Sequence, residues 1–261
     1  MANPRLDGVR LKLARAEEHL DALEAEMGRY LDGDVYILVR DEKCDRTVWH
    51  LWIKEEPPAR FSILLGDCIH NLRSALDHIA WQLVLANGAA PDEDTAFPIW
   101  DREPRDGVFA PKAIRGMSKD ALTLIESVQP YQAGDRASEH VLCFIRGLSN
   151  TDKHRTLNLT AASLKGINVR ILFGPDERVL HESSVPAGIF RHRAEVASFP
   201  LRTDEITRDD VKVESRGDMF IALKEPGPWG PEEPILTLAE QASRYLRFAV
   251  LPAVEALPEM K

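Results

Sequence analysis

Residues 60–88, RFSILLGDCIHNLRSALDHIAWQLVLANG, contain the strongest helical pattern of the chain. Asn87 and Gly88 favour a helix end, and Pro91 follows shortly after. Apolar residues recur every three or four positions, which is the repeat of one buried helix face: Leu65, Ile69, Leu72, Leu76, Ile79 and Leu83. The sequence therefore predicts a long helix over residues 60–87 with one narrow apolar face.

Helical spacing also occurs on both sides of this segment. The first thirty residues have it, and Ser118 is a candidate N-cap of a short helix that ends before Pro130. A further helix is expected from Ala137 to about Asp152. The last helix follows Pro234, whose missing amide donor is tolerated in a first helical turn.

Two β-rich runs, residues 35–39 and 47–53, are joined by a short charged segment, which predicts a β-hairpin. Beyond Arg155 the period changes to two, because apolar residues alternate in Ile167-Asn168-Val169-Arg170-Ile171. Strands and helices are thus segregated along the chain. This favours an α+β fold, a helical bundle with an N-terminal β-hairpin and an inserted antiparallel β-rich block.

The domain organisation follows from the same pattern. We expect a helical bundle with the β-hairpin over residues 1–155, a β-rich insertion over residues 156–231, and a C-terminal helix over residues 232–261 that returns to the bundle. No single helix can bury its apolar face alone, so the N-terminal, central and C-terminal helices are expected to pack together.

The charge balance excludes one class of function. The chain has 261 residues with 42 acidic and 33 basic side chains, a net charge of -9. A uniformly negative surface repels phosphate, so nucleic-acid binding by general electrostatic attraction is excluded, whereas a local basic site is not.

Cysteine usage and hydropathy indicate the compartment. Cys44, Cys68 and Cys143 are widely spaced and form no CxxC pair, which argues against a disulfide framework or a zinc knuckle. No apolar run approaches the length of a membrane span, and Met1 to Leu20 is heavily charged, unlike a secretory signal. We therefore expect a cytoplasmic protein without membrane association.

The polar residues of the central helix form two lines beside its apolar face. One line contains Asp67, Asn71, Ser74 and His78, and the other contains His70, Arg73, Asp77 and Trp81. Lys and Glu, the usual residues of a solvated helix face, are absent between Arg60 and Gly88. This pattern indicates either a functional site or a buried structural network that joins helices.

Residues 73–78, Arg-Ser-Ala-Leu-Asp-His, resemble the signature of HEPN-type domains, helical bundles that often act as metal-independent endoribonucleases. The resemblance implies that Arg73 stabilises an RNA phosphate, that His78 transfers protons, and that two copies form the site as a homodimer. Ser74 occupies the polar position after the arginine. The β-rich block is not part of a minimal HEPN bundle.

The position of His78 relative to Arg73 restricts this hypothesis. Five residues correspond to roughly 140° around a helix, so the two side chains do not share a face. A groove that contains both needs a partner helix or a second subunit. His70, Asn71, Ser74 and Asp77 are the expected substrate-binding residues of the same helix.

A second resemblance covers more of the chain. Residues 70–78, HNLRSALDH, and residues 152–155, DKHR, resemble a group of uncharacterised bacterial proteins, for which no activity is known. Lys153, His154 and Arg155 are expected either to reach the groove of the Arg73 helix and bind phosphate or simply to complement a helix dipole.

Other chemistries lack their motifs. The sequence contains no HExxH or ExxH metal pattern, no GxxxxGK[ST] phosphate loop and no GxSxG elbow, so we predict neither a metal nor a cofactor. The functional hypothesis is an endoribonuclease of toxin or defence type that acts on RNA as a homodimer; its RNA target and any antitoxin partner are not identified by the sequence. The alternative is a non-catalytic helical protein with a structural polar network or a ligand-binding groove.

Overall fold

The computed structural model describes residues 4–33, 35–43, 46–104, 112–154, 156–163, 167–173, 175–185, 188–189, 193–200, 211–216, 219–225, 228 and 233–260. The chain forms two compact units from interleaved segments. Unit 1 comprises residues 1–25, 59–157 and 236–261, and unit 2 comprises residues 26–58 and 158–235. Helices build unit 1 and antiparallel strands dominate unit 2, which confirms the predicted α+β class and its N-terminal β-hairpin.

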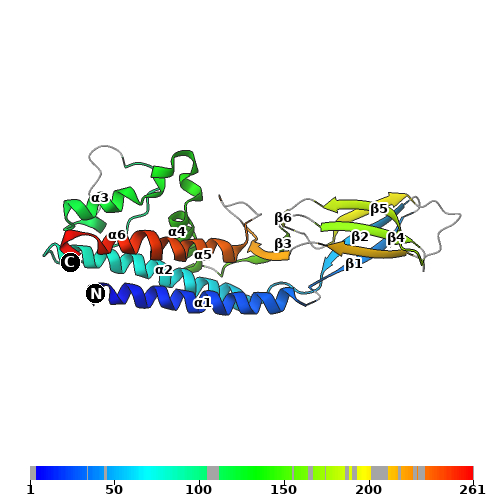
Figure 1. Ribbon diagram of the computed structural model, residues 1–261, viewed down its shortest axis with the longest axis horizontal. Coiled ribbons are helices and arrows are strands. Elements are labelled where there is room, and N and C mark those ends of the chain that lie inside the picture. Colours follow the sequence, from blue (N-terminus) through cyan, green and yellow to red (C-terminus); the bar gives the residue numbers. More distant parts are fainter. Residues whose placement is uncertain are drawn as a thin grey trace. The chain divides into compact units, whose positions relative to one another are not determined.

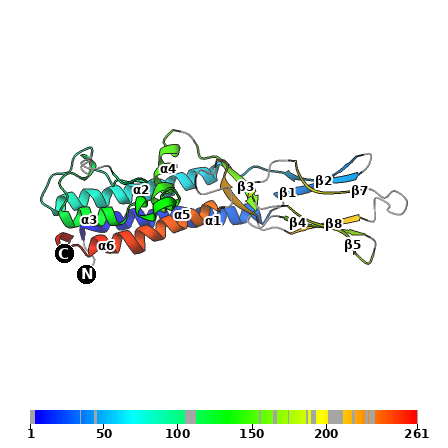
Figure 2. The ribbon, with the colours of Figure 1, turned by 90° about the horizontal axis from the view of Figure 1, so that it is seen from above.

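Unit 1 is built around three long helical segments. They are α1 (Asp7–Leu31), α2 (Ala59–Ala86) and a C-terminal pair, α5 (Ile235–Tyr245) and α6 (Leu251–Glu255). These segments run alongside one another in both views (Figures 1 and 2). The predicted apolar line of α2 is buried along its whole length. Among the described residues, no helix combines the length and hydrophobicity needed to cross a membrane.

Two shorter helices, α3 (Lys119–Ser127) and α4 (Val141–Asp152), complete unit 1. Ser118 caps α3 as predicted, because its hydroxyl accepts the backbone N–H of Ala121 at 3.0 Å. The helix expected from Ala137 begins only at Val141, since residues Pro130–Glu139 form 3-10 turns and His140 is the N-cap of α4. Helix α4 packs against α2, which brings the two polar segments singled out in the sequence next to each other.

The C-terminal helix widens where α5 passes into α6. Residues Leu246–Val250 form a π-helical turn, in which the Leu251 N–H donates to the Leu246 carbonyl five residues earlier. Pro252 follows at once and has no N–H to donate, so the regular ladder is interrupted at this point. The other end of the chain is close by, because the Arg5 guanidinium donates to the Glu259 carbonyl at 3.3 Å.

In the described part of unit 2, nine strands form three antiparallel three-stranded sheets. The first sheet has the order β1-β2-β7, from β1 (Tyr36–Glu42), β2 (Arg46–Ile53) and β7 (Ala194–Pro200). The second, β6-β3-β9, consists of β6 (Gly188–Ile189), β3 (Leu159–Ser163) and β9 (Met219–Leu223). The third, β5-β4-β8, consists of β5 (Arg178–Val185), β4 (Ile167–Phe173) and β8 (Val211–Arg216).

The β-hairpin belongs to unit 2, whereas the sequence grouped it with the helices. Strand β2 pairs along one edge with β1, with Leu38 opposite Leu51, and along the other with β7. Leu51 forms a buried cluster with Val196 and Ala197, two residues of β7. A two-stranded hairpin is marginal in water by itself, and a third strand supplies the hydrogen bonds and apolar face that it lacks. The domain boundaries therefore fall near residues 25, 58, 157 and 235.

Candidate functional site

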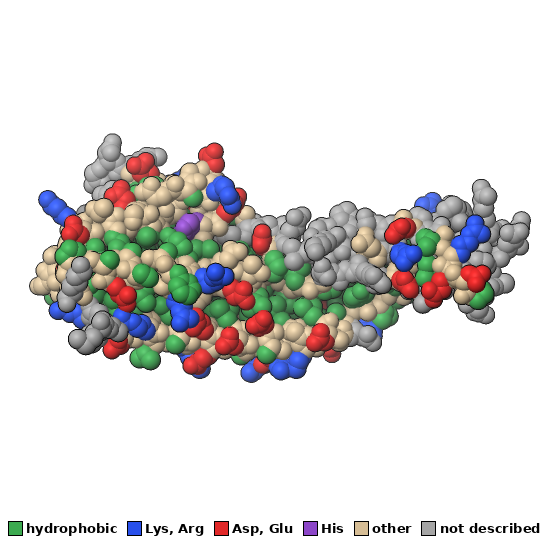
Figure 3. Space-filling model, viewed as in Figure 1, with side chains coloured by type: hydrophobic (Ala, Val, Ile, Leu, Met, Phe, Trp, Pro, Cys, Tyr) green, Lys and Arg blue, Asp and Glu red, His purple; other side chains and the backbone are tan. Residues whose placement is uncertain are grey.

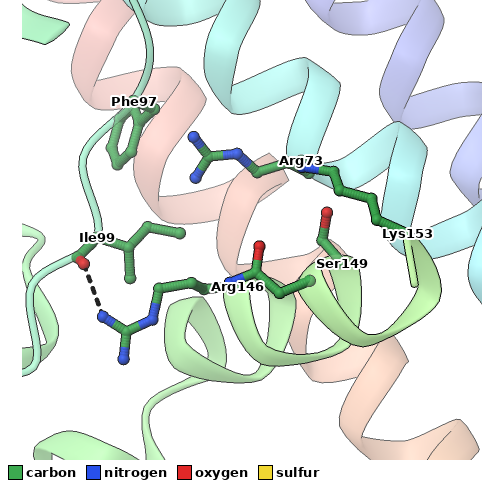
Figure 4. A pocket seen from close by; sticks show the side chains of 7 residues that line it. Arg73, Phe97, Ile99, Arg146, Ser149 and Lys153 are labelled. Carbon is green, nitrogen blue, oxygen red and sulfur yellow. Dashed lines mark hydrogen bonds between the residues drawn. The ribbon is translucent and has the colours of Figure 1, made fainter. Parts of the chain in front are cut away.

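A cavity of about 230 Å³ lies where α4 packs near α2. Arg73 reaches it from α2, and Phe97 and Ile99 line it from the segment after α2. The rest of the lining is Arg146, Ser149 and Asn150 from α4 and Lys153, the residue that follows this helix. The cavity thus combines three cationic side chains with two apolar ones. Figure 4 shows Arg73 pointing towards the Phe97 ring and Lys153 extending from the end of α4 towards Arg73.

Arg73 is held in place by Asp77, one turn further along α2. The guanidinium Nε and Nη2 groups donate to Asp77 Oδ2 at 3.1 Å and Oδ1 at 2.7 Å. Asp77 Oδ1 also accepts the backbone N–H of Phe97 at 3.0 Å. These bonds occupy one edge of the guanidinium, and among the described residues Nη1 donates no hydrogen bond. Arg73 is thereby both oriented and left with donors for a ligand.

Arg146 is anchored on the opposite wall of the cavity. Its Nη1 donates to the Ile99 carbonyl at 2.9 Å (Figure 4), and its Nη2 donates to Asp101 Oδ2 at 2.9 Å. The hydrogen bond from Arg146 is the main reason that the pKa of Asp101 lies below its ordinary value. Asp101 therefore stays ionised and keeps the Arg146 side chain extended along the cavity wall.

Lys153 is the C-cap residue of α4 and is exposed, so its ammonium group is accessible from solvent. Ser149 is one turn earlier and is buried, and Asn150 lies beside it at the rim. The cavity thus presents an ammonium, guanidinium donors, a hydroxyl and an amide. This set of donors suits an anion with several oxygens, such as a phosphate group.

A second polar cluster lies one turn N-terminal to Arg73, between α2 and the end of α4. Burial raises the pKa of Asp152, and the nearby Asp67 carboxylate raises it further, while His70 acts in the opposite direction. Gly66 makes this approach possible, because a Cβ atom there would lie 2.5 Å from Asp152 Oδ1. His70 and Asp152 are therefore neighbours. Lys153, the residue after Asp152, lines the basic cavity, so this cluster lies next to that cavity.

His78 lies on another side of α2 and does not line this cavity. Its Nδ1 atom is next to Gly8, where a Cβ atom would approach it to 3.0 Å, so the imidazole lies against the first turn of α1. The imidazole is nevertheless exposed. Within one chain, the two residues of the HEPN-like motif therefore do not meet in one cavity.

The remaining predicted site residues have varied surroundings. Asn71 is buried, and its amide donates to the Asp67 carbonyl at 2.8 Å, a bond within α2. Ser74 is partly exposed and His154 is exposed, and neither lines the cavity. Arg155 lies outside the described residues.

In the described part of the chain, no group of three or more His, Cys, Asp or Glu side chains is placed to hold one metal ion. The polar groups that line the basic cavity are two guanidinium groups, an ammonium, a hydroxyl and an amide.

Arg146 is the functional candidate that sequence reasoning missed. Its signal is the spacing of Arg146, Ser149, Asn150 and Lys153, which recur at three or four positions along α4 and form its polar face. Leu148 is the one large apolar residue within this line, and the apolar run Val141-Leu142-Cys143-Phe144-Ile145 precedes it.

Comparison with known proteins finds no matching family model, no similar curated protein and no similar solved structure.

Proposed function

We propose that unit 1 binds the phosphate groups of RNA at the basic cavity between α2 and α4. The observation that supports this proposal is that Arg73, Arg146 and Lys153 line one cavity of about 230 Å³ in a protein whose net charge is -9. An acidic chain that binds phosphate must concentrate cations locally. The choice of RNA rests on the resemblance of residues 73–78 to the HEPN motif.

Two of these cations are positioned rather than mobile. Asp77 orients Arg73, and the Ile99 carbonyl with Asp101 orients Arg146. Asp77 offsets part of the positive charge of Arg73, and Asp101 offsets part of that of Arg146. Of the three cations that line the cavity, Lys153 therefore has the charge that is least offset by carboxylates of the described residues. Loss of Lys153 should therefore weaken phosphate binding more than loss of any exposed lysine elsewhere in unit 1.

The test is fluorescence anisotropy with a labelled single-stranded RNA over a salt series from about 50 to 200 mM. Lys153→Ala should lower the affinity, and the slope of log affinity against log salt should fall by about one, the signature of one lost phosphate contact. Lys119→Ala is the matched control, because Lys119 is an exposed lysine on α3 outside the cavity. Equal affinities for the wild type and Lys153→Ala would refute the proposed site.

A second candidate function is RNA cleavage by a homodimer. It is favoured by the exposure of His78, which leaves this imidazole accessible to a second copy although it lies against Gly8. RNA contains its own nucleophile, the 2′-hydroxyl, so cleavage needs proton transfer and charge stabilisation without a metal. In this proposal Arg73 of one copy binds the phosphate and His78 of the other transfers protons.

Mixing inactive variants tests this arrangement directly. Arg73→Ala and His78→Ala should each lose about 10²-fold or more of the cleavage rate, in the presence or absence of EDTA, with little change in melting temperature. Because a mixed dimer keeps one intact shared site, an equimolar mixture should regain about a quarter of the wild-type activity. His19→Ala is the histidine control, because His19 is a partly exposed residue of α1 outside the basic cavity. Wild-type protein that binds RNA but cleaves none refutes this candidate and leaves the binding proposal intact.

A further inference from the structure

A second cavity of unit 1, of about 250 Å³, has the opposite electrostatic character. Glu17, Asp21 and Glu24 line it from α1, and Glu240, Ser243 and Arg244 line it from α5. Acidic and basic side chains are interspersed over the helices on the face seen in Figure 3, so the acidic character of this cavity comes from its own lining residues. This cavity is distinct from the basic cavity, with which it shares no lining residue.

The cavity holds more negative than positive charge. Four carboxylates line it, while Arg244 lines it and Arg247 forms an ion pair with Glu17. Four negative charges against two positive ones leave an excess of two. Asp21, Glu24 and Glu240 are exposed, so water screens part of their mutual repulsion, and a ligand with positive charge would relieve the rest.

A buried hydroxyl group in the same cavity also lacks a partner. Ser243 is 3% exposed, and its Oγ atom has no hydrogen-bond partner among the residues that the structure describes. Buried hydroxyl groups are normally paired, because an unpaired one loses its bonds to water without replacement. A serine hydroxyl both donates and accepts hydrogen bonds, whereas ionised carboxylates only accept, so a ligand that donates can bond to Ser243 and to the surrounding carboxylates alike.

The spacing of the carboxylates favours an organic cation over a metal ion. Glu17 and Glu24 are seven positions apart on α1, with Asp21 between them, which corresponds to about 10 Å along the helix axis. Metal ions need several oxygens about 2.0–2.6 Å from one centre, and the described residues contain no group of three acidic, His or Cys side chains so arranged. Ammonium groups separated by a short aliphatic chain can instead contact carboxylates spread along a helix.

We infer that this cavity binds an aliphatic diamine or polyamine. One ammonium group would contact Asp21 and Glu240 and donate towards Ser243 Oγ, and a second would be neutralised by the carboxylates further along α1. The excess of two negative charges matches a ligand with two ammonium groups. The inference is independent of the proposed RNA site.

Isothermal titration calorimetry of the full chain with putrescine, spermidine and MgCl₂ tests the inference. We expect binding of either amine with one ligand per chain, and no comparable binding of Mg²⁺. Asp21→Asn and Glu240→Gln should each weaken amine binding about tenfold or more, as expected for loss of a charge-assisted hydrogen bond. Glu93→Gln, an exposed carboxylate outside the cavity, is the control and should bind like the wild type.

Ser243→Ala separates a ligand site from mere charge attraction. Removal of an unpaired buried hydroxyl should raise the melting temperature of the ligand-free protein. Putrescine should then raise the melting temperature of Ser243→Ala less than that of the wild type, because the ligand has lost a hydrogen-bond partner. Absence of amine binding, equal binding of Mg²⁺, or unchanged affinity in both carboxylate variants would overturn the inference.

Discussion

Gly66 on α2 leaves space for the carboxylate of Asp152 at the end of α4: a Cβ atom at Gly66 would lie 2.5 Å from Asp152 Oδ1 and 2.9 Å from its Cγ. Glycine is otherwise a poor choice in the middle of a 28-residue helix. The close approach of α4 explains why glycine is found there. It also places Asp152 beside His70 and Lys153 at the basic cavity.

Replacement of Gly66 by alanine should destabilise unit 1 although alanine favours helix. The methyl group forces Asp152 and the last turn of α4 to move, and overpacking of this kind costs about 1–3 kcal/mol. Gly28→Ala on α1 is the matched control, because nothing lies within 4 Å of a Cβ atom there and the exchange should stabilise the helix. Urea unfolding followed by circular dichroism measures both. A Gly66→Ala variant more stable than the wild type would contradict the close packing of α4 on α2.

Asp77 should matter for stability through the backbone bond that it accepts. Phe97 is fully buried, and its N–H donates to Asp77 Oδ1. Asp77→Ala leaves this N–H unpaired and should cost about 1–3 kcal/mol of unfolding free energy. Asp77→Asn retains an acceptor oxygen and should lose less. Denaturant unfolding of the two variants gives the order, and equal losses would show that the ion pair with Arg73 dominates instead.

Stability should depend on the protonation of His140. Its Nδ1 accepts the backbone N–H of Leu142 at 3.2 Å and so caps α4, and its ring contacts Tyr245 edge to face. Burial lowers the pKa of His140 below its ordinary value of 6.5. Between the folded pKa and 6.5 the unfolded chain binds more protons, so stability decreases as the pH falls through this window.

Thermal melts from pH 7.5 to pH 5 test this expectation. His140→Asn is the suitable comparison, because asparagine is a good N-cap and does not titrate. The wild type should lose more stability than this variant as the pH falls. Parallel pH profiles for the two proteins would exclude His140 as the titrating group.

The two buried cysteines should be unreactive in the folded protein. Burial raises the pKa of Cys68 to about 12, and it also raises the pKa of Cys143 despite the nearby Arg146. With a pKa near 12, only about one Cys68 in ten thousand is a thiolate at pH 8. In a Cys44→Ser background, used because Cys44 lies outside the described residues, Ellman's reagent should detect thiols only after denaturation. Rapid labelling of native protein would indicate an opening of unit 1.

Local features of the fold were predicted from the sequence because they depend on neighbours within a few residues. The apolar line of α2 follows from residue spacing, and the cap at Ser118 requires only a hydroxyl and an N–H three residues apart. The β-hairpin follows from two β-rich runs joined by a short segment. The start of α4 was placed too early, at Ala137, because residues 137–139 belong to a 3-10 turn and His140 caps the helix.

The candidate site was predicted only in part, because its walls come from distant segments. Arg73 and Lys153 were recognised, but Arg146 binds the Ile99 carbonyl 47 residues away, in a stretch without any periodic pattern. The acidic cavity is lined by residues of α1 and of α5, and these two sets of residues are more than 200 positions apart in the sequence.

The sequence by itself determined the helices, the hairpin and the concentration of polar residues on α2, since periodicity and capping act over one or two turns. Only the tertiary structure decided that β2 pairs with β7 rather than staying with the helices, and that Arg73 faces α4 while His78 faces Gly8. The physical reason is that a helix has several faces and a hairpin has two edges. Burial and hydrogen bonding between segments that are distant in the sequence decide which element packs against each face and which strand pairs with each edge.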